Sequence, residues 1–224
     1  MSFGDKKLSE IAVSVPGSTS LLREYDLDFC CGGSDTLANA AAEKGLNLAE
    51  IETRLTELQN SKAENPEEYW VNATYPEIID HILVRYHQRH REQLQELIML
   101  ADRVESVHGD RDDCPIGVAA ELRNVYDDLS NHMMKEEHVL FPMIKAGNYM
   151  MAQMPIRMME MEHAEHGEHL DVLKSLTNNM TPPADACNTW RALYSGIQEF
   201  ADDLMMHIHR ENNILFPRVI AENH

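Results

Sequence analysis

The sequence predicts an all-α protein, in which an up-down-up-down bundle of four long helices follows a small helical N-terminal domain. Aromatic residues make up only 6% of the chain, whereas methionine occurs 14 times. This composition favours helices, because strands favour aromatic and β-branched side chains. Four long stretches with helical spacing follow residue 73, and short connections between such stretches make neighbouring helices antiparallel.

Residues 1–58 are expected to form the small N-terminal domain. Apolar residues recur with helical spacing within 8–15, 37–42 and 48–58, and Gly45 is a stop signal after the second stretch. The turn-rich segment Tyr-Asp-Leu-Asp-Phe-Cys-Cys-Gly-Gly lies between the first two stretches, at 25–33. Residues 59–73 are polar and contain Pro66, which predicts a linker.

The bundle is expected to cover residues 74–222. Its first helix begins at a capping box formed by Thr74 and Glu77, with Pro76 in the first turn, and extends to about Val107. The other three helices are expected at about 115–145, 155–178 and 181–217. Helices of about 30 residues are about 45 Å long.

Charge and hydropathy exclude several kinds of partner. The chain has 19 Lys and Arg against 38 Asp and Glu, giving a net charge of −19. Such a surface repels polyanions, so neither nucleic acid nor a membrane is expected as a partner. No stretch approaches the roughly 20 apolar residues of a membrane span, and we recognise no signal peptide. Four cysteines, two of them adjacent, form no disulfide framework, so a cytoplasmic location is expected.

An internal repeat points to the functional site. In each copy a histidine is followed four positions later by a glutamate, and then by Leu-Phe-Pro; the two copies stand 75 residues apart. The pairs are His132 with Glu136, and His207 with Glu211. A two-helix unit has therefore been used twice.

Each copy also contains an upstream histidine. His87 and His163 open matching His-x-x-His segments that stand 76 residues apart, with His90 and His166 as their second members. We expect the first histidine of each segment to face the same point as the His–Glu pairs, and the second to lie at the edge of the core.

The residue types in this set predict metal binding. Residues four apart share a helix face, and an isolated buried carboxylate costs several kcal/mol, so a duplicated inward-facing set needs a cation. Four imidazoles and two carboxylates suit two ions, with bridging glutamates and two histidines on each ion. These ligands suit iron, although ligand type alone leaves zinc and manganese open.

On these residues the chain resembles the hemerythrin-like family and, over its full length, the di-iron proteins that repair iron–sulfur clusters. The resemblance implies two iron ions with an oxo or hydroxo bridge, held by His87, His132, Glu136, His163, His207 and Glu211. Oxygen-carrying hemerythrins place an Asp five positions after one histidine, whereas Asn212 stands there after His207. That departure suits redox chemistry or nitric oxide binding better than oxygen storage.

The same resemblance implies a stress-response function. We expect repair of iron–sulfur clusters damaged by nitrosative or oxidative stress, through iron supply or nitric oxide removal. Iron–sulfur proteins would then be partners and nitric oxide or dioxygen small ligands, and a homodimer is compatible with this function. A nitric oxide reductase-type di-iron enzyme, with nitric oxide reduction or nitrosyl transfer at the centre, and a sensor or reversible binder of oxygen or nitric oxide are the alternatives.

The Asp28–Gly33 segment is similar to the cysteine-pair motif of the repair family's N-terminal domain. Its glycines allow an exposed turn, in which Cys30 and Cys31 would handle redox chemistry, nitrosyl groups or iron. A purely structural role for the two buried thiols is the alternative.

Overall fold

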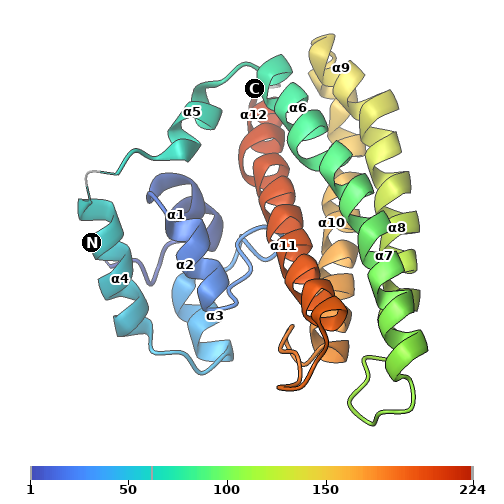
Figure 1. The fold of residues 1–224 in the computed structure, drawn as a ribbon. Coiled ribbons are helices and arrows are strands. Elements are labelled where there is room, and N and C mark those ends of the chain that lie inside the picture. The colour runs from blue at the N-terminus through green and yellow to red at the C-terminus, as the bar shows by residue number, and fades with distance from the viewer. Residues whose placement is uncertain (1, 62, 223–224) are drawn as a thin grey trace. The chain divides into compact units, whose positions relative to one another are not determined.

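The computed structural model describes residues 2–61 and 63–222, and within these ranges it is helical with no β-strand (Figure 1). By their internal contacts the residues form two units: residues up to 78 together with those from 206 onward, and residues 79–205. Helix α11 (Asn188–Arg210) runs through the boundary without a break. The all-α prediction is confirmed.

The first unit contains five N-terminal helices and the C-terminal end of the chain. The helices are α1 (Leu8–Ser14), α2 (Ser18–Glu24), α3 (Leu37–Glu43), α4 (Leu48–Asn60) and α5 (Pro66–Asn72), and the C-terminal elements are η3 (Glu211–Leu215) and α12 (Phe216–Ala221). The side-chain oxygens of Thr36 and Asn47 accept hydrogen bonds from the first-turn amides of α3 and α4, which satisfies donors that a helix start leaves open. Buried apolar side chains, including Phe29, Leu37 and Leu55, form the core.

Two of these helices are not in the sequence prediction. No helix is predicted at α2, and α5 lies within the stretch predicted as a linker. Asn65 caps α5, Pro66 occupies its first turn and Glu67 is buried, so residues 66–72 are an ordered helix. The stretch is polar in the sequence, and only the structure shows that Glu67 pairs with Arg210 far along the chain.

The second unit contains the long helices of the bundle. Each predicted helix is one helical run (Figure 1). Two of the runs in this unit include a short π-helical turn. The runs are α6 (Tyr75–Ile82), η1 (Leu83–His87) and α7 (Gln88–His108); α8 (Val118–Lys135), η2 (Glu136–Leu140) and α9 (Phe141–Lys145); α10 (Tyr149–Leu176); and α11. Helix α10 begins six residues before Pro155, which lies inside it, and α11 begins at Asn188 rather than at 181.

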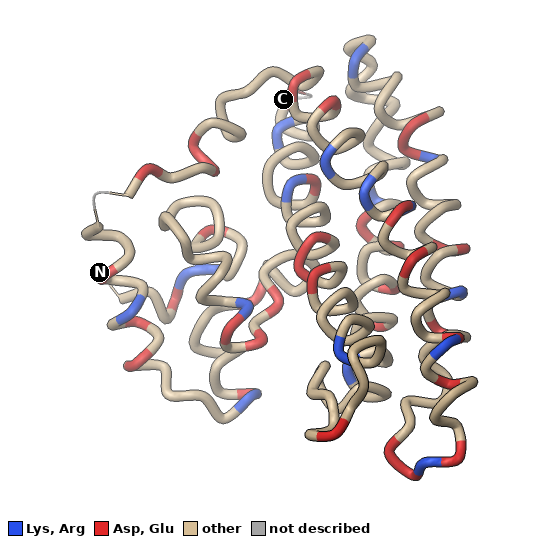
Figure 2. Tube along the Cα trace, in the orientation of Figure 1, with Lys and Arg blue, Asp and Glu red and all other residues tan. Residues whose placement is uncertain are grey.

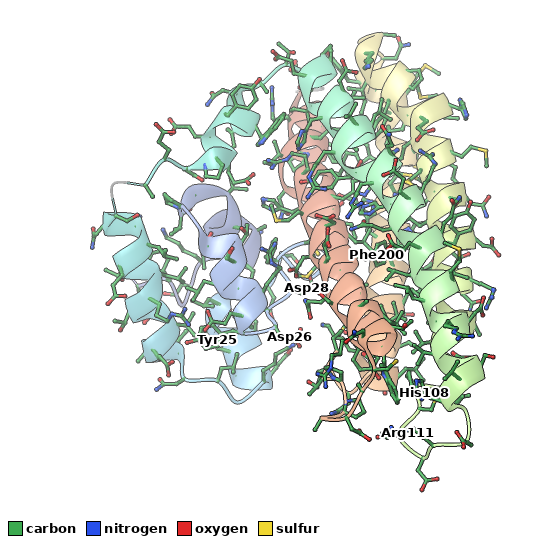
Figure 3. The ribbon with its side chains drawn as sticks, in the orientation of Figure 1. Tyr25, Asp26, Asp28, His108, Arg111 and Phe200 are labelled. Atoms are coloured by element: carbon green, nitrogen blue, oxygen red, sulfur yellow. The ribbon has the colours of Figure 1, made fainter. Side chains whose placement is uncertain are left out.

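Helices α7 and α11 pack closely at Gly196. A Cβ atom at Gly196 on α11 would lie 2.7 Å from Cδ2 of Leu97 on α7, so the two helices approach where the side chain is smallest. Phe200 on the same helix is fully buried (Figure 3). These apolar contacts position the polar residues of the interior.

Lys, Arg, Asp and Glu residues recur along the long helices (Figure 2). Arg123 of α8 pairs with Asp102 of α7 at 2.6 Å, and most such pairs are solvent-exposed and stabilise the fold little. Among the described residues, no helix combines the length and apolar character needed to cross a membrane.

One ion-pair cluster links α8 to α10. Nδ1 of His169 lies 2.6 Å from Oε1 of Glu121, and its Nε2 lies 3.0 Å from Oδ2 of Asp128. Burial lowers the pKa of His169, but the two carboxylates outweigh burial and raise the pKa above its ordinary 6.5. The imidazolium can donate to both carboxylates at once, which the neutral ring cannot.

This cluster predicts a pH-dependent contribution to stability. Because the folded-state pKa is raised, the stabilisation is fully present below the unfolded pKa and is lost as the pH rises through the folded pKa. We expect His169→Gln to lower the free energy of unfolding by up to about 1 kcal/mol at mildly acidic pH and by almost nothing at alkaline pH. Urea unfolding at both pH values, with exposed His138→Gln as a control, measures this; a pH-independent loss would contradict it.

Candidate metal centre

The six predicted ligands all lie in the interior of the protein. His132 is 1% exposed and the other five are 0% exposed. Four different helical runs supply them: His87 from η1, His132 and Glu136 from α8 and η2, His163 from α10, and His207 and Glu211 from α11 and η3. The prediction that both copies of the repeat direct polar side chains inward is therefore confirmed.

π-helical turns position three of the six side chains. His87 is the last residue of η1, and Glu136 and Glu211 are the first residues of η2 and η3. Pro142 and Pro217 follow the latter two turns. Proline removes a backbone hydrogen bond to the residue four positions earlier, which favours the wider turn at both glutamates. Such turns occur often at functional sites.

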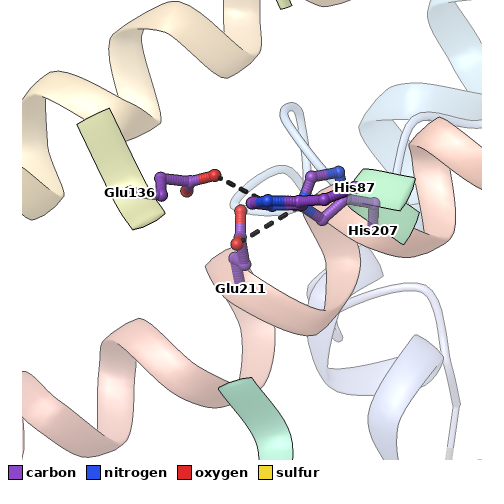
Figure 4. A group of neighbouring side chains, drawn as sticks. All are labelled: His87, Glu136, His207 and Glu211. Atoms are coloured by element: carbon purple, nitrogen blue, oxygen red, sulfur yellow. Dashed lines mark ion pairs between the residues drawn. The ribbon is translucent and has the colours of Figure 1, made fainter. Parts of the chain in front are cut away.

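The distances between ligand atoms match those of neighbouring ligands on one ion. Nε2 of His132 lies 3.0 Å from Nε2 of His163, and Oε2 of Glu136 lies 3.3 Å from Nε2 of His87. Nε2 of His207 lies 3.4 Å from Oε1 of Glu211 (Figure 4). Two ligands with bonds of about 2.1 Å to one ion, at angles between octahedral and tetrahedral, lie roughly 3.0–3.4 Å apart.

The ligand atoms form two groups of four. In each group the atoms lie within 4.8 Å of one another; the groups are His87, Glu136, His207 and Glu211 (Figure 4), and His132, Glu136, His163 and Glu211. Both glutamates are common to the two groups, whereas each histidine belongs to one. Each group has the donor set for one cation.

Comparison with known proteins identifies the family. A family model described as the hemerythrin HHE cation binding domain matches residues 78–219, more than half of the chain. The chain belongs to this family. Residues 4–59 match a second family, described as a domain of unknown function (DUF542). The predicted hemerythrin-like fold is confirmed, and the hemerythrin HHE domain is one that binds metal cations.

Several relatives match over almost their whole length. The chain is 68% identical over 222 residues to the "Probable iron-sulfur cluster repair protein" of Haemophilus influenzae, covering 99% of this chain and 100% of the relative. It is 55% identical over 221 residues to the "Iron-sulfur cluster repair protein YtfE" of Musicola paradisiaca, covering 98% of each chain. Identity to the protein of that name from Escherichia coli is 54% over 222 residues, covering 99% of each.

In this hemerythrin HHE domain, carboxylates behind two of the histidines fix their orientation. Nδ1 of His87 donates to Oε1 of Glu137 at 2.8 Å, and Nδ1 of His132 donates to Oε2 of Glu162 at 2.9 Å. This tautomer places the lone pair on Nε2, the atom that faces the ligand group. The hydrogen bond from His87, aided by Arg91, lowers the pKa of Glu137 to about 2.

The sequence pattern does not single out Glu137. It directly follows Glu136, and the corresponding residue of the second copy is Asn212, so the repeat gives no signal for it. Only the tertiary structure shows that its carboxylate, on η2, reaches His87 at the end of η1. The second histidines, His90 and His166, are 0% and 3% exposed and so lie within the core rather than at its edge, and they belong to neither group.

The structure corrects the expected exposed turn at the cysteine pair. Asp28, on the loop between α2 and α3 (Figure 3), accepts hydrogen bonds at Oδ1 from the amides of Cys30 and Cys31, both 2.9 Å long. Cys30 is buried and Cys31 is half-buried, and the two are not joined in a disulfide, since their sulfurs lie 3.8 Å apart. Hydrogen bonding to Cys31 and burial raise the pKa of Cys30 well above its ordinary value. Cys30 is therefore a thiol, and Cys31 is the member of the pair that solvent reaches.

The glycines after the cysteines serve close packing. A Cβ atom at Gly33 would lie 2.4 Å from the carbonyl oxygen of Phe29 and 3.0 Å from Cβ of Ser9. Since the nearest obstacle is backbone, no side-chain rotation relieves the clash.

We expect Gly33→Ala to destabilise the first unit by about 1–3 kcal/mol, the range for overpacking. Urea unfolding followed by circular dichroism measures the loss. Ser34→Ala, a change at the exposed neighbouring residue, is the control. Equal stability of the two variants would show that the loop adapts to a side chain at Gly33.

Glu137 provides a test of the oriented histidine. Removing a carboxylate behind a metal-bound histidine typically weakens metal binding 10- to 100-fold. We expect Glu137→Gln to weaken metal retention by a factor in that range, because the amide holds the ring of His87 less firmly. Competition with a chelator measures retention, and Glu96→Gln on the exposed side of α7 is the control. Retention equal to that of the wild type would exclude this role.

Proposed function

We propose that this protein is a non-haem di-iron protein that repairs iron–sulfur clusters damaged by nitrosative or oxidative stress. One observation supports it above all: two groups of four buried ligand atoms share both glutamates. Six ligands arranged in this way suit two ions, each with two histidines, bridged by Glu136 and Glu211. Relatives that match over almost their full length carry the name of iron–sulfur cluster repair proteins.

The donor chemistry fits iron. Four imidazoles and two carboxylates, without a thiolate in either group, suit an intermediate metal ion better than a soft one. When bound, iron would supply redox chemistry and coordination positions for a diatomic ligand. The protein's own residues hold the rings of His87 and His132 in one tautomer through Glu137 and Glu162, and exclude bulk water by burial of all six ligands.

Cys31 extends the proposal to the N-terminal domain. It is the half-buried member of the pair, and the sulfurs of Cys30 and Cys31 lie close to Asp28 in a third group of ligand atoms. We assign the pair a role in redox, nitrosyl or iron handling, with Cys31 as the residue that reacts first. Iron–sulfur proteins in the cytoplasm are the proposed clients.

The first test is metal content with the optical spectrum. We expect about two irons per chain, as in other di-iron bundles, with absorption from a bridged pair. The double variant Glu136→Ala, Glu211→Ala should lose both, because each glutamate belongs to both groups. The matched control changes two exposed glutamates, Glu96→Ala and Glu165→Ala. Zinc in place of iron, one metal per chain, or iron unaffected by the double change would refute the di-iron proposal.

The second test is repair itself. An iron–sulfur enzyme inactivated by nitric oxide should regain activity with the iron-loaded protein and not with the glutamate double variant. Loss of iron from the protein during repair indicates iron supply. Multiple turnovers of nitric oxide to nitrous oxide indicate the reductase, and tight reversible binding without reactivation indicates a sensor.

A further inference from the structure

The helical turn that carries Glu211 is tied to the N-terminal helices by the residues on either side of it. His209 and Arg210 precede Glu211, and Asn212 and Asn213 follow it. Each of these four side chains contacts a residue between 29 and 70, all within the first unit. Glu211 therefore lies in the middle of the segment 209–213, whose other four side chains all contact the N-terminal helices and the cysteine turn.

Two asparagines hold the backbone of the cysteine turn. Nδ2 of Asn212 donates to the carbonyl oxygen of Cys30 at 3.0 Å, and Nδ2 of Asn213 donates to that of Phe29 at 2.8 Å. The amide of Asn213 also donates to Nδ1 of His209 at 2.8 Å, so His209 carries its proton on Nε2. The ring of Phe29 packs edge-on against His209, with centroids 5.4 Å apart.

Buried charges complete the network. Arg210 pairs with Glu67 of α5, and Nε2 of His209 lies 3.4 Å from Oε2 of the same carboxylate. The guanidinium of Arg210 also lies 4.8 Å from the ring centre of Trp70. His209, Arg210 and Glu67 are 0%, 3% and 5% exposed, so their hydrogen bonds form in a low-dielectric interior where geometry is tightly set.

The first copy of the repeat lacks this network. The positions that correspond to His209, Arg210 and Asn213 hold exposed residues, namely Met134, Lys135 and His138. The position that corresponds to Asn212 holds Glu137, which binds His87 instead. The bundle thus does not need these contacts to place a glutamate, and only the second copy has been adapted to the N-terminal domain.

We propose that Glu67, His209, Arg210, Asn212 and Asn213 are positioning residues through which the N-terminal domain sets the position of Glu211 and the rate of iron release. This inference rests on the proposed di-iron function. Because the acceptors of the two asparagines belong to the cysteine turn, a covalent change at Cys30 or Cys31 alters the support of Glu211. The Cys-Cys turn is then a control element for iron release.

The test measures iron release from the full-length, iron-loaded protein to excess chelator. We expect the double variant Asn212→Ala, Asn213→Ala and the single variant Glu67→Gln to release iron about tenfold faster, the lower end of the range for lost supporting contacts. Their absorption spectra before release should also shift, since Glu211 belongs to both ligand groups. His138→Ala, at the equivalent position of the first copy, and Glu68→Gln, exposed beside Glu67, should behave as wild type.

The outcomes separate this inference from the proposed function. Wild-type protein without iron refutes the proposed function before any variant is compared. If the wild type holds iron and the variants release it at the wild-type rate, the positioning role alone is refuted. Faster release with an unchanged spectrum and a lowered unfolding midpoint shows a purely structural role and also overturns it. Asn212→Ala, which removes a single contact, serves if the double variant does not fold.

A thiol reagent tests the control element. In a background of Cys114→Ser and Cys187→Ser, N-ethylmaleimide can add only to Cys30 or Cys31; the sulfur bonds to one alkene carbon and the thiol proton goes to the other. With addition confirmed by mass spectrometry, we expect faster iron release. Adding Asn212→Ala and Asn213→Ala should abolish that acceleration. Equal acceleration in both backgrounds, or none in either, would refute the link.

Discussion

The burial of two carboxylates among four imidazoles is the constraint on which this structure depends. A lone carboxylate in such an interior is strongly unfavourable, and a cation shared with neutral histidines offsets that cost. The family assignment as a cation-binding domain agrees with this requirement. The long helices carry these side chains, and π-helical turns begin at Glu136 and Glu211.

The two copies of the repeat supply equivalent ligands, but the residues that surround those ligands differ between the copies. Each copy supplies an upstream histidine, His87 or His163, and a His–Glu pair, His132 with Glu136 or His207 with Glu211. Behind the ligands, however, the first copy uses Glu137 to orient His87, whereas the second uses Asn212 to hold the backbone of Cys30. Glu137 thus supports a ligand from within the bundle, whereas the turn that carries Glu211 is held by the N-terminal helices.

The surroundings of the cysteine pair make Cys30 and Cys31 differ in reactivity. Asp28 accepts hydrogen bonds from its amides, and close packing at Gly33 fixes its shape. A buried thiol with a raised pKa reacts slowly, because the thiolate is the nucleophile. Cys31 is half-buried, and reagents that reach it meet a turn whose carbonyls hold Asn212 and Asn213.

The sequence by itself determined the all-α class, the repeat and all six candidate ligands, because helical spacing and a duplicated His–Glu pattern are local signals. Only the tertiary structure decided which residues support the ligands. Glu137 and Glu67 look like ordinary surface acids in the sequence, since their partners, His87 and Arg210, lie 50 and 143 residues away. The burial of Cys30 and the helix at 66–72 were likewise missed, because both depend on contacts with the far end of the chain. Local sequence patterns indicate the secondary structure and the possible chemistry of a residue, whereas long-range packing decides which residues its side chain contacts.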